Sequence, residues 1–392
     1  MKHYFLGLAA NYSRKRRLTH TFTVGREKDR CELCEFLGQK YEGEAILTKN
    51  GRSALALALK AYFEPGDAVI VNGFTCYAVY EAVKAARLTP IWADISSEDL
   101  NYNIKSLGAA LAAACPSDNS SQAAQAKSSR SAEHIAANAV PKGIIVQNSL
   151  GNPADIAAVE KFAKKHNLTI IEDLAHSAGA KYPDGREAGT VGAAAAFSFG
   201  KDKAIDTISG GAAVLRHPYK NAIEAPSKLP KISDTLRARF YPLFGAIAQV
   251  LSYIHLSGAW MHALVKIHWV EKSADNALDL DRKIAKFEAK LALRQLKALK
   301  KTGGKPIREF YLVRDREKVL KKLQKAGYYF GGFWYEKPVS PERYYKKVHF
   351  PENECPVAVK TAEKIINFPT FYSKKDLKKA YKIIAEYREE TK

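Results

Sequence analysis

The chain has few cysteines, and they follow no regular spacing. Five occur in 392 residues, an odd number that argues against a disulfide framework and favours a reducing, cytoplasmic compartment. Only one CxxC pair is present, at Cys31 and Cys34, whereas a zinc site built on such pairs needs a second one. We therefore predict no metal site, and interpret these two thiols as neighbours on a helix face.

Two further signals are absent. The first residues, MKHYFLGLAANYSRKRR, have a short apolar stretch and a basic run but no small-residue cleavage site, so they do not form a secretory signal. The formal net charge of +21 is spread along the chain, without the aromatic interleaving of a nucleic-acid module. This charge favours phosphorylated small molecules or an anionic lipid surface as partners and gives no indication of nucleic acid.

Apolar strand-like segments alternate with amphipathic helix-like segments from about residue 45 to 215. The expected strands are residues 68–74, 89–95, 142–148, 168–173 and 194–199, and the expected helices include residues 53–63, 77–87 and 155–166. Such alternation predicts an α/β fold with a mostly parallel sheet covered on both faces. Ligands of these sheets bind beyond the carboxyl ends of the strands.

Two stretches interrupt this pattern. Residues 112–139 are rich in Ala, Ser, Asn and Gln and are expected to form a flexible insertion. Residues 241–270 contain no acid and only one lysine, and three interpretations stay open: a helical arm that packs on the protein or a dimer partner, an interfacial helix, or a membrane span. The predicted organisation is a large α/β domain (1–235), an apolar arm (236–280) and a small α+β domain (281–392).

The segment FSFGKDKAIDTISGG (197–211) places two lysines, Lys201 and Lys203, between an apolar strand and a pair of glycines. A lysine that acts as a nucleophile needs a desolvated site. The strand before it favours such a site, the glycines allow close backbone approach, and Ser198 can donate a hydroxyl to a phosphate. The residue types alone leave open which lysine is used, and a solvated turn is the alternative.

A second signal is IIEDLAHSAGA (170–180), which ends an apolar strand with two acids. Asp173 lies at the strand end, and Glu172 alternates to the opposite face. Pyridoxal phosphate needs both a lysine for its aldehyde and a carboxylate for its ring nitrogen, so Asp173 is a candidate for the second role. Capping of the next turn is the alternative for Asp173, and His176 could face the cofactor or pack in the core.

The segment TKNGRSALALALK (48–60) starts a predicted helix with Gly51, Arg52 and Ser53. The positive end of a helix and its free backbone N–H groups bind anions, and Arg52 and Ser53 add side-chain donors. On its own this is an ordinary helix start. Together with the lysine and the acid it predicts a complete cradle for the cofactor.

The order of NGRSALALAL, PGDAVIVNGFTCYAV, GNPADI, IIEDLAHSAGA, FSFGKDKAIDTISGG and FPT resembles the DegT/StrS family of fold-type-I pyridoxal-phosphate enzymes. The family's spacing after Ser-Phe selects Lys203 as the covalent anchor. The resemblance also assigns Asp173 to the ring nitrogen, His176 to the family's His/Gln position, and Asn50, Gly51, Arg52 and Ser198 to the phosphate. It extends the expected cofactor contacts to Cys76, Tyr77 and Asn148.

Three positions depart from the family pattern. Cys76 stands where an aromatic residue commonly stacks on the ring, Ser209 replaces a glutamate before the paired glycines, and Asn148 replaces a histidine. The resemblance implies a homodimeric aminotransferase that moves an amino group, with glutamate as donor, to a nucleotide-linked keto sugar for cell-surface polysaccharide or secondary-metabolite synthesis. The alternatives are a catalytically silent cofactor-binding sensor or scaffold at a membrane and a related sugar dehydratase. Lys203 argues against the dehydratase, because the resembling dehydratases have histidine there.

Overall fold

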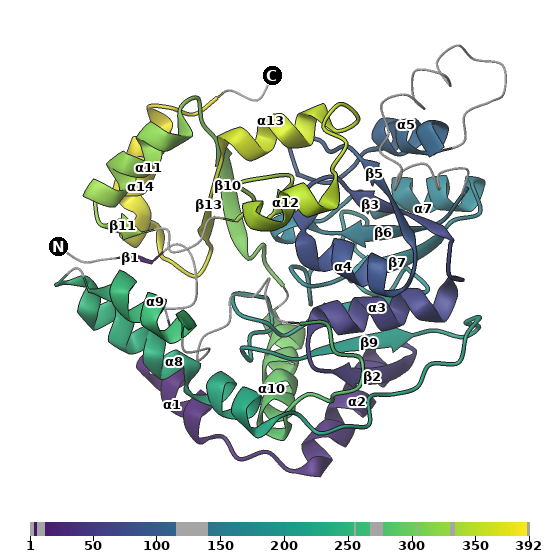
Figure 1. Ribbon diagram of the computed structural model, residues 1–392, viewed down its shortest axis with the longest axis horizontal. Helices are drawn as coiled ribbons and strands as arrows, with labels where there is room; N and C mark the ends of the chain where they lie inside the picture. Colours follow the sequence, from purple (N-terminus) through teal and green to yellow (C-terminus); the bar gives the residue numbers. More distant parts are fainter. Residues whose placement is uncertain are drawn as a thin grey trace.

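A seven-stranded sheet in the order β2-β9-β8-β7-β6-β3-β5 forms the centre of the molecule (Figure 1). The computed structural model describes residues 4–5, 12–114, 140–254, 256–266, 277–302, 304–329 and 334–389. Strand β9 runs antiparallel to both of its neighbours, and the other pairings in this sheet are parallel, which confirms the mostly parallel sheet predicted from the sequence. The strands are β2 (Glu44–Thr48), β3 (Ala68–Asn72), β5 (Thr89–Ala93), β6 (Pro141–Gln147), β7 (Thr169–Asp173), β8 (Ala194–Ser198) and β9 (Gly211–Leu215).

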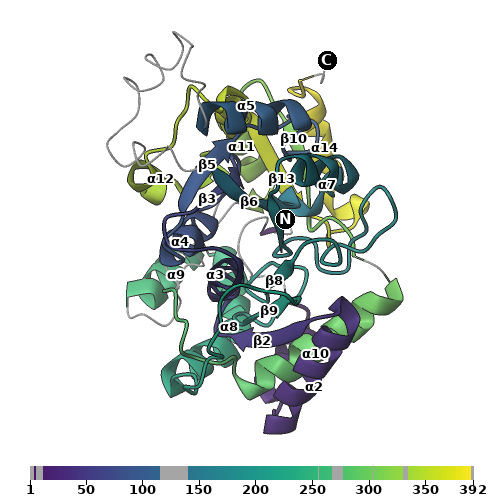
Figure 2. The ribbon, with the colours of Figure 1, turned by 90° about the vertical axis from the view of Figure 1, so that its right-hand side faces the viewer.

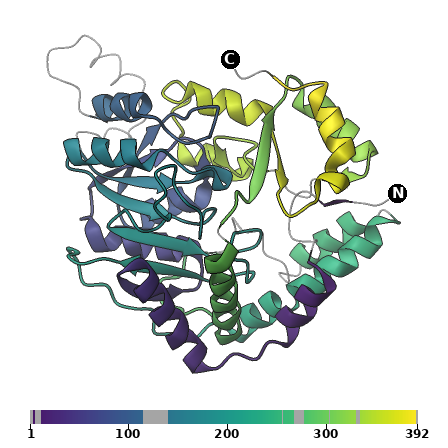
Figure 3. The same cartoon turned by 180° about the vertical axis from the view of Figure 1, so that it is seen from behind.

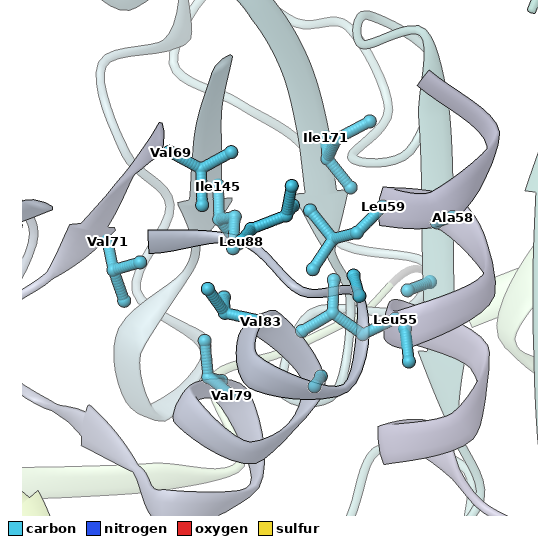
Figure 4. Close-up of a cluster of buried hydrophobic side chains, with 14 of the residues drawn as sticks. Leu55, Ala58, Leu59, Val69, Val71, Val79, Val83, Leu88, Ile145 and Ile171 are labelled. Atoms are coloured by element: carbon cyan, nitrogen blue, oxygen red, sulfur yellow. The ribbon is translucent and has the colours of Figure 1, made fainter. Parts of the chain in front are cut away.

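The sheet is covered on both faces, because its strands are apolar at consecutive positions. Ile145 and Ile171 pack on one face with α3 (Gly51–Tyr62) and α4 (Tyr77–Ala85) (Figure 4). Their neighbours Ile144 and Ile170 belong to the other core, with α2 (Glu27–Tyr41), α5 (Ile104–Ala114), α7 (Ile156–Lys165) and α10 (Lys286–Thr302). This alternation explains why no strand of the sheet has a polar face.

Helix boundaries follow local capping. The Asn50 side chain accepts a hydrogen bond from the Ser53 N–H at 2.9 Å and begins α3, and Asp155 caps α7 in the same way. The three helices predicted in this region are therefore confirmed, with ends shifted by up to two residues. Of the predicted insertion, residues 112–114 end α5, and the remainder lies outside the described residues.

The C-terminal part forms a smaller α/β layer (Figure 1). Antiparallel strands β10 (Arg308–Leu312) and β13 (Ile365–Pro369) share a core with α11 (Arg316–Lys325) and α14 (Lys374–Ala385). Helices α12 (Glu342–Val348) and α13 (Pro356–Lys364) precede β13, and the short strand β12 (Val339–Ser340) pairs with β4 (Thr75–Cys76). Strand β1 (Tyr4–Phe5) pairs with β11 (Tyr328–Tyr329), and both of these short pairs are parallel. Helix α10 packs beside α2 on the central sheet (Figure 2), although its residues fall within the predicted small domain.

Three helices form the edge of the molecule below this layer in the views of Figures 1 and 3. They are α1 (Arg14–Phe22), α8 (Ile232–Ser252) and α9 (Ser257–Lys266), and their shared core includes Tyr12, Tyr241 and Leu264. The predicted apolar arm therefore begins within a helix that starts at Ile232. No helix in the described part of the chain is both long enough and apolar enough to cross a bilayer.

Candidate active site

Lys203 lies in the loop after β8, at the carboxyl edge of the sheet. Its Nζ is 2.8 Å from His176 Nε2 and 4.8 Å from the centre of the Trp334 ring. His176 in turn accepts the Leu150 N–H on Nδ1 at 3.2 Å, so Nε2 carries the ring proton if the imidazole is neutral. In that tautomer the Nε2–H donates to Nζ, which can accept this hydrogen bond only as a neutral amine.

Burial changes the protonation of both groups. It lowers the pKa of Lys203, an effect opposed by Cys76, Asp173 and Asp202. It also holds the pKa of His176 well below the usual range, and the Lys203 charge lowers it further. A desolvated lysine beside a neutral imidazole releases its proton more easily than a solvated one, as a nucleophilic amine requires.

Lys201 has different surroundings, although it lines the same cavity. Its Nζ is 4.6 Å from the centre of the Tyr241 ring on α8. The hydrogen bond to His176 and the position near Asp173 belong to Lys203. The geometry therefore favours the lysine that the family spacing selects.

Asp173 ends β7 and is 9% exposed. Its Oδ1 accepts the Ala175 N–H at 3.0 Å. Burial raises the pKa of this carboxyl, and the Ala175 N–H and Lys203 partly offset the effect. A cationic ligand group in the cavity would stabilise the ionised form, which is what a protonated ring nitrogen offers.

The start of α3 forms the other wall of the cavity. A Cβ at Gly51 would lie 2.4 Å from the Cβ of Ser198, so only glycine allows the helix start to approach the end of β8 this closely. Asn50, Gly51 and Ser198 all line the cavity. The positive end of a 12-residue helix therefore faces the same space as Lys203 and Asp173.

Arg52 reaches this cavity but forms an ion pair with Glu81 of α4. The Ser53 hydroxyl accepts the Asp279 N–H at 3.1 Å. Both side chains thus have protein partners, and Asn50 already accepts the Ser53 N–H, so the positive end of the helix is what this turn offers to an anion.

Most of the predicted site residues line one cavity in the structure, and three do not. Those that line it are Gly51, Arg52, Cys76, Asp173, His176, Ser198 and Lys203. Tyr77 stacks on Tyr344 with ring centres 4.3 Å apart, and the Asn148 side chain bonds the Ser177 hydroxyl and the Ala154 N–H. With Ser53, these residues surround the site without lining the cavity, and the cofactor contacts expected of them stay predictions.

Three further residues at the site were not identified from the sequence. Tyr335 and Gln147 line the cavity, and Trp334 contacts both His176 and Lys203. Gln147 donates to the Phe74 carbonyl and the Ser149 hydroxyl, which fixes its amide orientation. Gln147 ends β6 just as Asp173 ends β7, so its position at the carboxyl edge was the available signal. Trp334 and Tyr335 come from a C-terminal segment whose fold against the sheet the sequence pattern does not reveal.

Position 209 is a serine, but a glutamate from another part of the chain, Glu288, forms a hydrogen bond with it. The Ser209 hydroxyl donates to Glu288 Oε1 at 2.5 Å, and the Ala285 N–H donates to Oε2 at 3.1 Å. Glu288 comes from α10 and is 3% exposed. The adjoining Gly210 N–H donates to the Lys49 carbonyl at 2.8 Å. A carboxylate therefore still supports the glycine turn that packs on the start of α3.

Glu288 should make the protein less stable as the pH rises towards neutrality. Burial raises its pKa from 4.5 to about 7, with Ser209, the Ala285 N–H and Arg30 opposing this shift and Asp234 adding to it. Since the folded pKa is the higher one, the contribution is complete below pH 4.5 and is lost as the pH passes about 7. We expect urea unfolding to show a decline in wild-type stability between about pH 5 and pH 8, and Glu288→Gln to reduce that decline. Equal slopes in the two proteins would contradict this assignment.

The donor set matches the groups of pyridoxal phosphate. A desolvated lysine suits its aldehyde, a buried carboxylate its ring nitrogen, and a helix start its phosphate. Among the described residues, no cluster of His, Cys, Asp and Glu could hold a metal ion, and Cys31 and Cys34 lie on α2 as free thiols. Residues of three separate segments thus converge on the chemistry of a single organic cofactor.

Comparison with known proteins agrees with this site. The model of the DegT/DnrJ/EryC1/StrS aminotransferase family matches residues 14–225, which is more than half of the chain. The chain is 24% identical over 351 residues to the pleiotropic regulatory protein of Geobacillus stearothermophilus, covering 86% of this chain and 83% of that protein. It is 31% identical over 181 residues to the GDP-perosamine synthase of Escherichia coli O157:H7, covering 46% and 42%, so it matches less than half of that enzyme.

Solved structures show the same fold over almost the whole chain. A DegT/DnrJ/EryC1/StrS aminotransferase from Brucella abortus superposes with a TM-score of 0.62 at 21% identity, covering 95% of this chain and 93% of that one. The Spr1654 protein of Streptococcus pneumoniae in its PLP form gives 0.59 at 16% identity, with 98% of each chain covered. The chain belongs to the DegT/DnrJ/EryC1/StrS aminotransferase family.

Proposed function

We propose that this aminotransferase uses pyridoxal phosphate to move an amino group from an amino acid, glutamate being the expected donor, to a nucleotide-linked keto sugar. The observation that carries the proposal is the convergence of Lys203, His176 and Asp173 on a cavity whose far wall is the start of α3. The sugar product would enter cell-surface polysaccharide or secondary-metabolite synthesis.

Each part of the site has a proposed role. Lys203 holds the cofactor covalently, Asp173 keeps its ring nitrogen protonated, and the start of α3 at Gly51 binds the phosphate with Ser198. When bound, the cofactor supplies a carbonyl for amine exchange and a ring that accepts electrons. Cys76 and His176 line the same space and complete its walls.

Lys203 also moves the proton that transamination requires. Once Nζ is released from the cofactor, this amine can take a proton from Cα of the amino donor and then deliver the proton to a different carbon atom. Its lowered pKa keeps a larger share of the amine neutral at physiological pH. The neutral His176 imidazole can hold this amine in place through Nε2.

Charge and resemblance support the sugar nucleotide as acceptor. A formal net charge of +21 attracts a diphosphate, and the synthase from Escherichia coli is named for a GDP-linked sugar. A homodimer is expected as well, because fold-type-I enzymes build their active sites from two subunits.

The reaction can be tested in halves. The purified protein loaded with pyridoxal phosphate should react with L-glutamate, and the spectrum should change from the aldehyde to the amine form. The amine form is then mixed with 3-keto and 4-keto sugar nucleotides, and the aminated product is identified by mass. Spectral change with glutamate followed by amination of one sugar would support the whole proposal; a change with another amino acid would replace the donor only.

A second candidate function is a catalytically silent cofactor-binding regulator. The observation that favours it is the match to a protein named as a pleiotropic regulator along 83% of that protein's length. Absence of any spectral change across a panel of amino acids, in a protein that still binds the cofactor, would favour this candidate over the enzyme.

A further inference from the structure

Helix α8 has an apolar outer face. Between residues 234 and 252, three side chains are exposed, and all three are aliphatic. They are Leu236, Ile247 and Val250, with exposed fractions of 41%, 41% and 70%. The residues that α8 buries include small and polar ones, namely Ala238, Tyr241, Pro242, Gly245, Ala248 and Ser252. A surface helix of a soluble protein ordinarily has the opposite polarity.

These side chains follow a regular pattern. Leu236, Phe240, Leu243, Ile247, Val250 and Ile254 are spaced by alternating steps of four and three residues. This spacing places them along one side of a helix. Ile254, Tyr253 and Leu256 extend the exposed apolar surface beyond the end of α8, each more than half exposed.

The surroundings of this face are basic. The sequence has no Asp or Glu from residue 235 to 270. Helix α1 lies along α8, where Arg17 donates to Gln249 at 2.5 Å and Arg239 donates to the Thr21 carbonyl at 2.9 Å (Figures 1 and 3). Arg14 and Lys15 at the start of α1 are exposed, as is Lys266 at the end of α9.

Helix α1 adds apolar side chains of its own. Leu18 is 46% exposed and Phe22 is 71% exposed, within the same short helix as the exposed Arg14 and Lys15. The combination of aliphatic and aromatic side chains with basic residues and no acids is typical of helices that lie at the surface of an anionic bilayer.

We propose that the outer face of α8, together with the start of α1, binds an anionic lipid bilayer. The apolar stripe from Leu236 to Ile254 enters the interfacial region, and Arg14 and Lys15 interact with the headgroups. Two copies of the protein joined through this face would bring two basic surfaces together, because α1, α9 and α8 after Asp234 contain no Asp or Glu. Anionic lipids instead complement that charge, which favours a membrane over a second copy.

The same helix contacts the active-site loop on its inner side. Tyr241 of α8 lies under Lys201, 4.6 Å from ring centre to Nζ, two residues before Lys203. Lipid binding on the outer face would therefore place the candidate active site close to the membrane surface, where an acceptor carried by the membrane could reach it. This surface is proposed independently of the reaction, because it rests on other residues.

The test is sedimentation of the full-length protein with phosphatidylcholine vesicles, with and without phosphatidylserine. We expect binding to the anionic vesicles, weakened by salt, and little binding to the neutral ones. The variant Ile247→Glu/Val250→Glu should bind at least about tenfold more weakly, since it places two charges in the apolar stripe. Ile104→Glu on α5 is the matched control, because Ile104 is also 41% exposed, and it should bind like the wild type.

Two outcomes would overturn the proposal. They are no binding of the wild type to either vesicle, and binding that the double substitution leaves unchanged. If the wild type binds no vesicles and the double substitution makes the protein monomeric by analytical ultracentrifugation, this face is a contact between copies. Cofactor binding by each variant reports whether it is folded, and no substrate is needed, so failure here is distinguishable from failure of the proposed reaction.

Discussion

Replacing Lys203 with alanine is expected to remove the visible absorbance of the covalently held cofactor, at about 420 nm, and to lower turnover by about 10²- to 10⁴-fold. The reason is that one nitrogen would serve two functions. It anchors the cofactor, and once released it moves the proton between carbons. The surrounding residues cannot replace it, because the His176 imidazole has a pKa far below its usual range and Lys201 lies against Tyr241.

Lys201→Ala is the matched control. It removes a lysine from the same loop and the same cavity, and it should retain the absorbance band even if turnover falls. Circular dichroism should show both variants folded, and Lys203→Ala removes a buried polar group together with its desolvation cost. An unchanged band in Lys203→Ala, or loss of the band in Lys201→Ala alone, would transfer the anchoring role to the other lysine.

The central sheet was predictable because its strands are short apolar runs separated by amphipathic helices. Strands β3, β5, β6, β7 and β8 all lie where the pattern indicated. Strand β9, GAAVL, is made of small residues next to a glycine pair, and β2 begins with a glutamate, so neither has a strong strand signal. Their pairing, which makes β9 the one antiparallel strand, depends on contacts between distant segments.

The active site was predictable where its residues belong to sheet ends and helix starts. Asp173 and Gly51 follow directly from such positions, whereas the family spacing selected Lys203 over Lys201, and the structure brings all three to one cavity. Trp334 and Glu288 could not be found in this way, since their contacts with Lys203 and Ser209 depend on how distant segments pack. Partners that lie far apart in the sequence are not visible in it. The carboxylate that contacts Ser209 was therefore identified only in the structure, where Glu288 of α10 supplies it.

The apolar arm illustrates the same limit. Its composition left packing, an interfacial helix and a span as alternatives, and composition does not say which face of a helix is buried. In the structure the small and polar side chains of α8 face the protein, whereas Leu236, Ile247 and Val250 face outwards. That reversal of polarity, rather than the total hydrophobicity, is the observation that points to a partner surface.

Replacing Glu172 with alanine is expected to destabilise the fold by about 3–5 kcal/mol. Glu172 is fully buried on the face of β7 opposite Asp173. Its carboxylate accepts four hydrogen bonds, from the Tyr182 hydroxyl at 2.7 Å and the N–H groups of Gly189, Val191 and Gly192 at 2.7, 2.8 and 2.6 Å. Alanine would leave these donors buried without an acceptor, and each such group costs about 1–3 kcal/mol.

The position of Glu172 explains why its substitution should also weaken cofactor binding at the active site. The loop that it holds leads directly into β8, which ends at Ser198 and is followed by Lys203. Denaturant unfolding should show the midpoint of Glu172→Ala well below that of the wild type, and the variant should also retain the cofactor less tightly.

Glu160→Ala is the control, because Glu160 is about half exposed (48%) and pairs with Arg186 at the surface; its loss should cost at most about 1 kcal/mol. If the two variants unfolded at the same denaturant concentration, the buried carboxylate would not be what fixes the loop, and its four hydrogen bonds would have to be replaced by water on substitution.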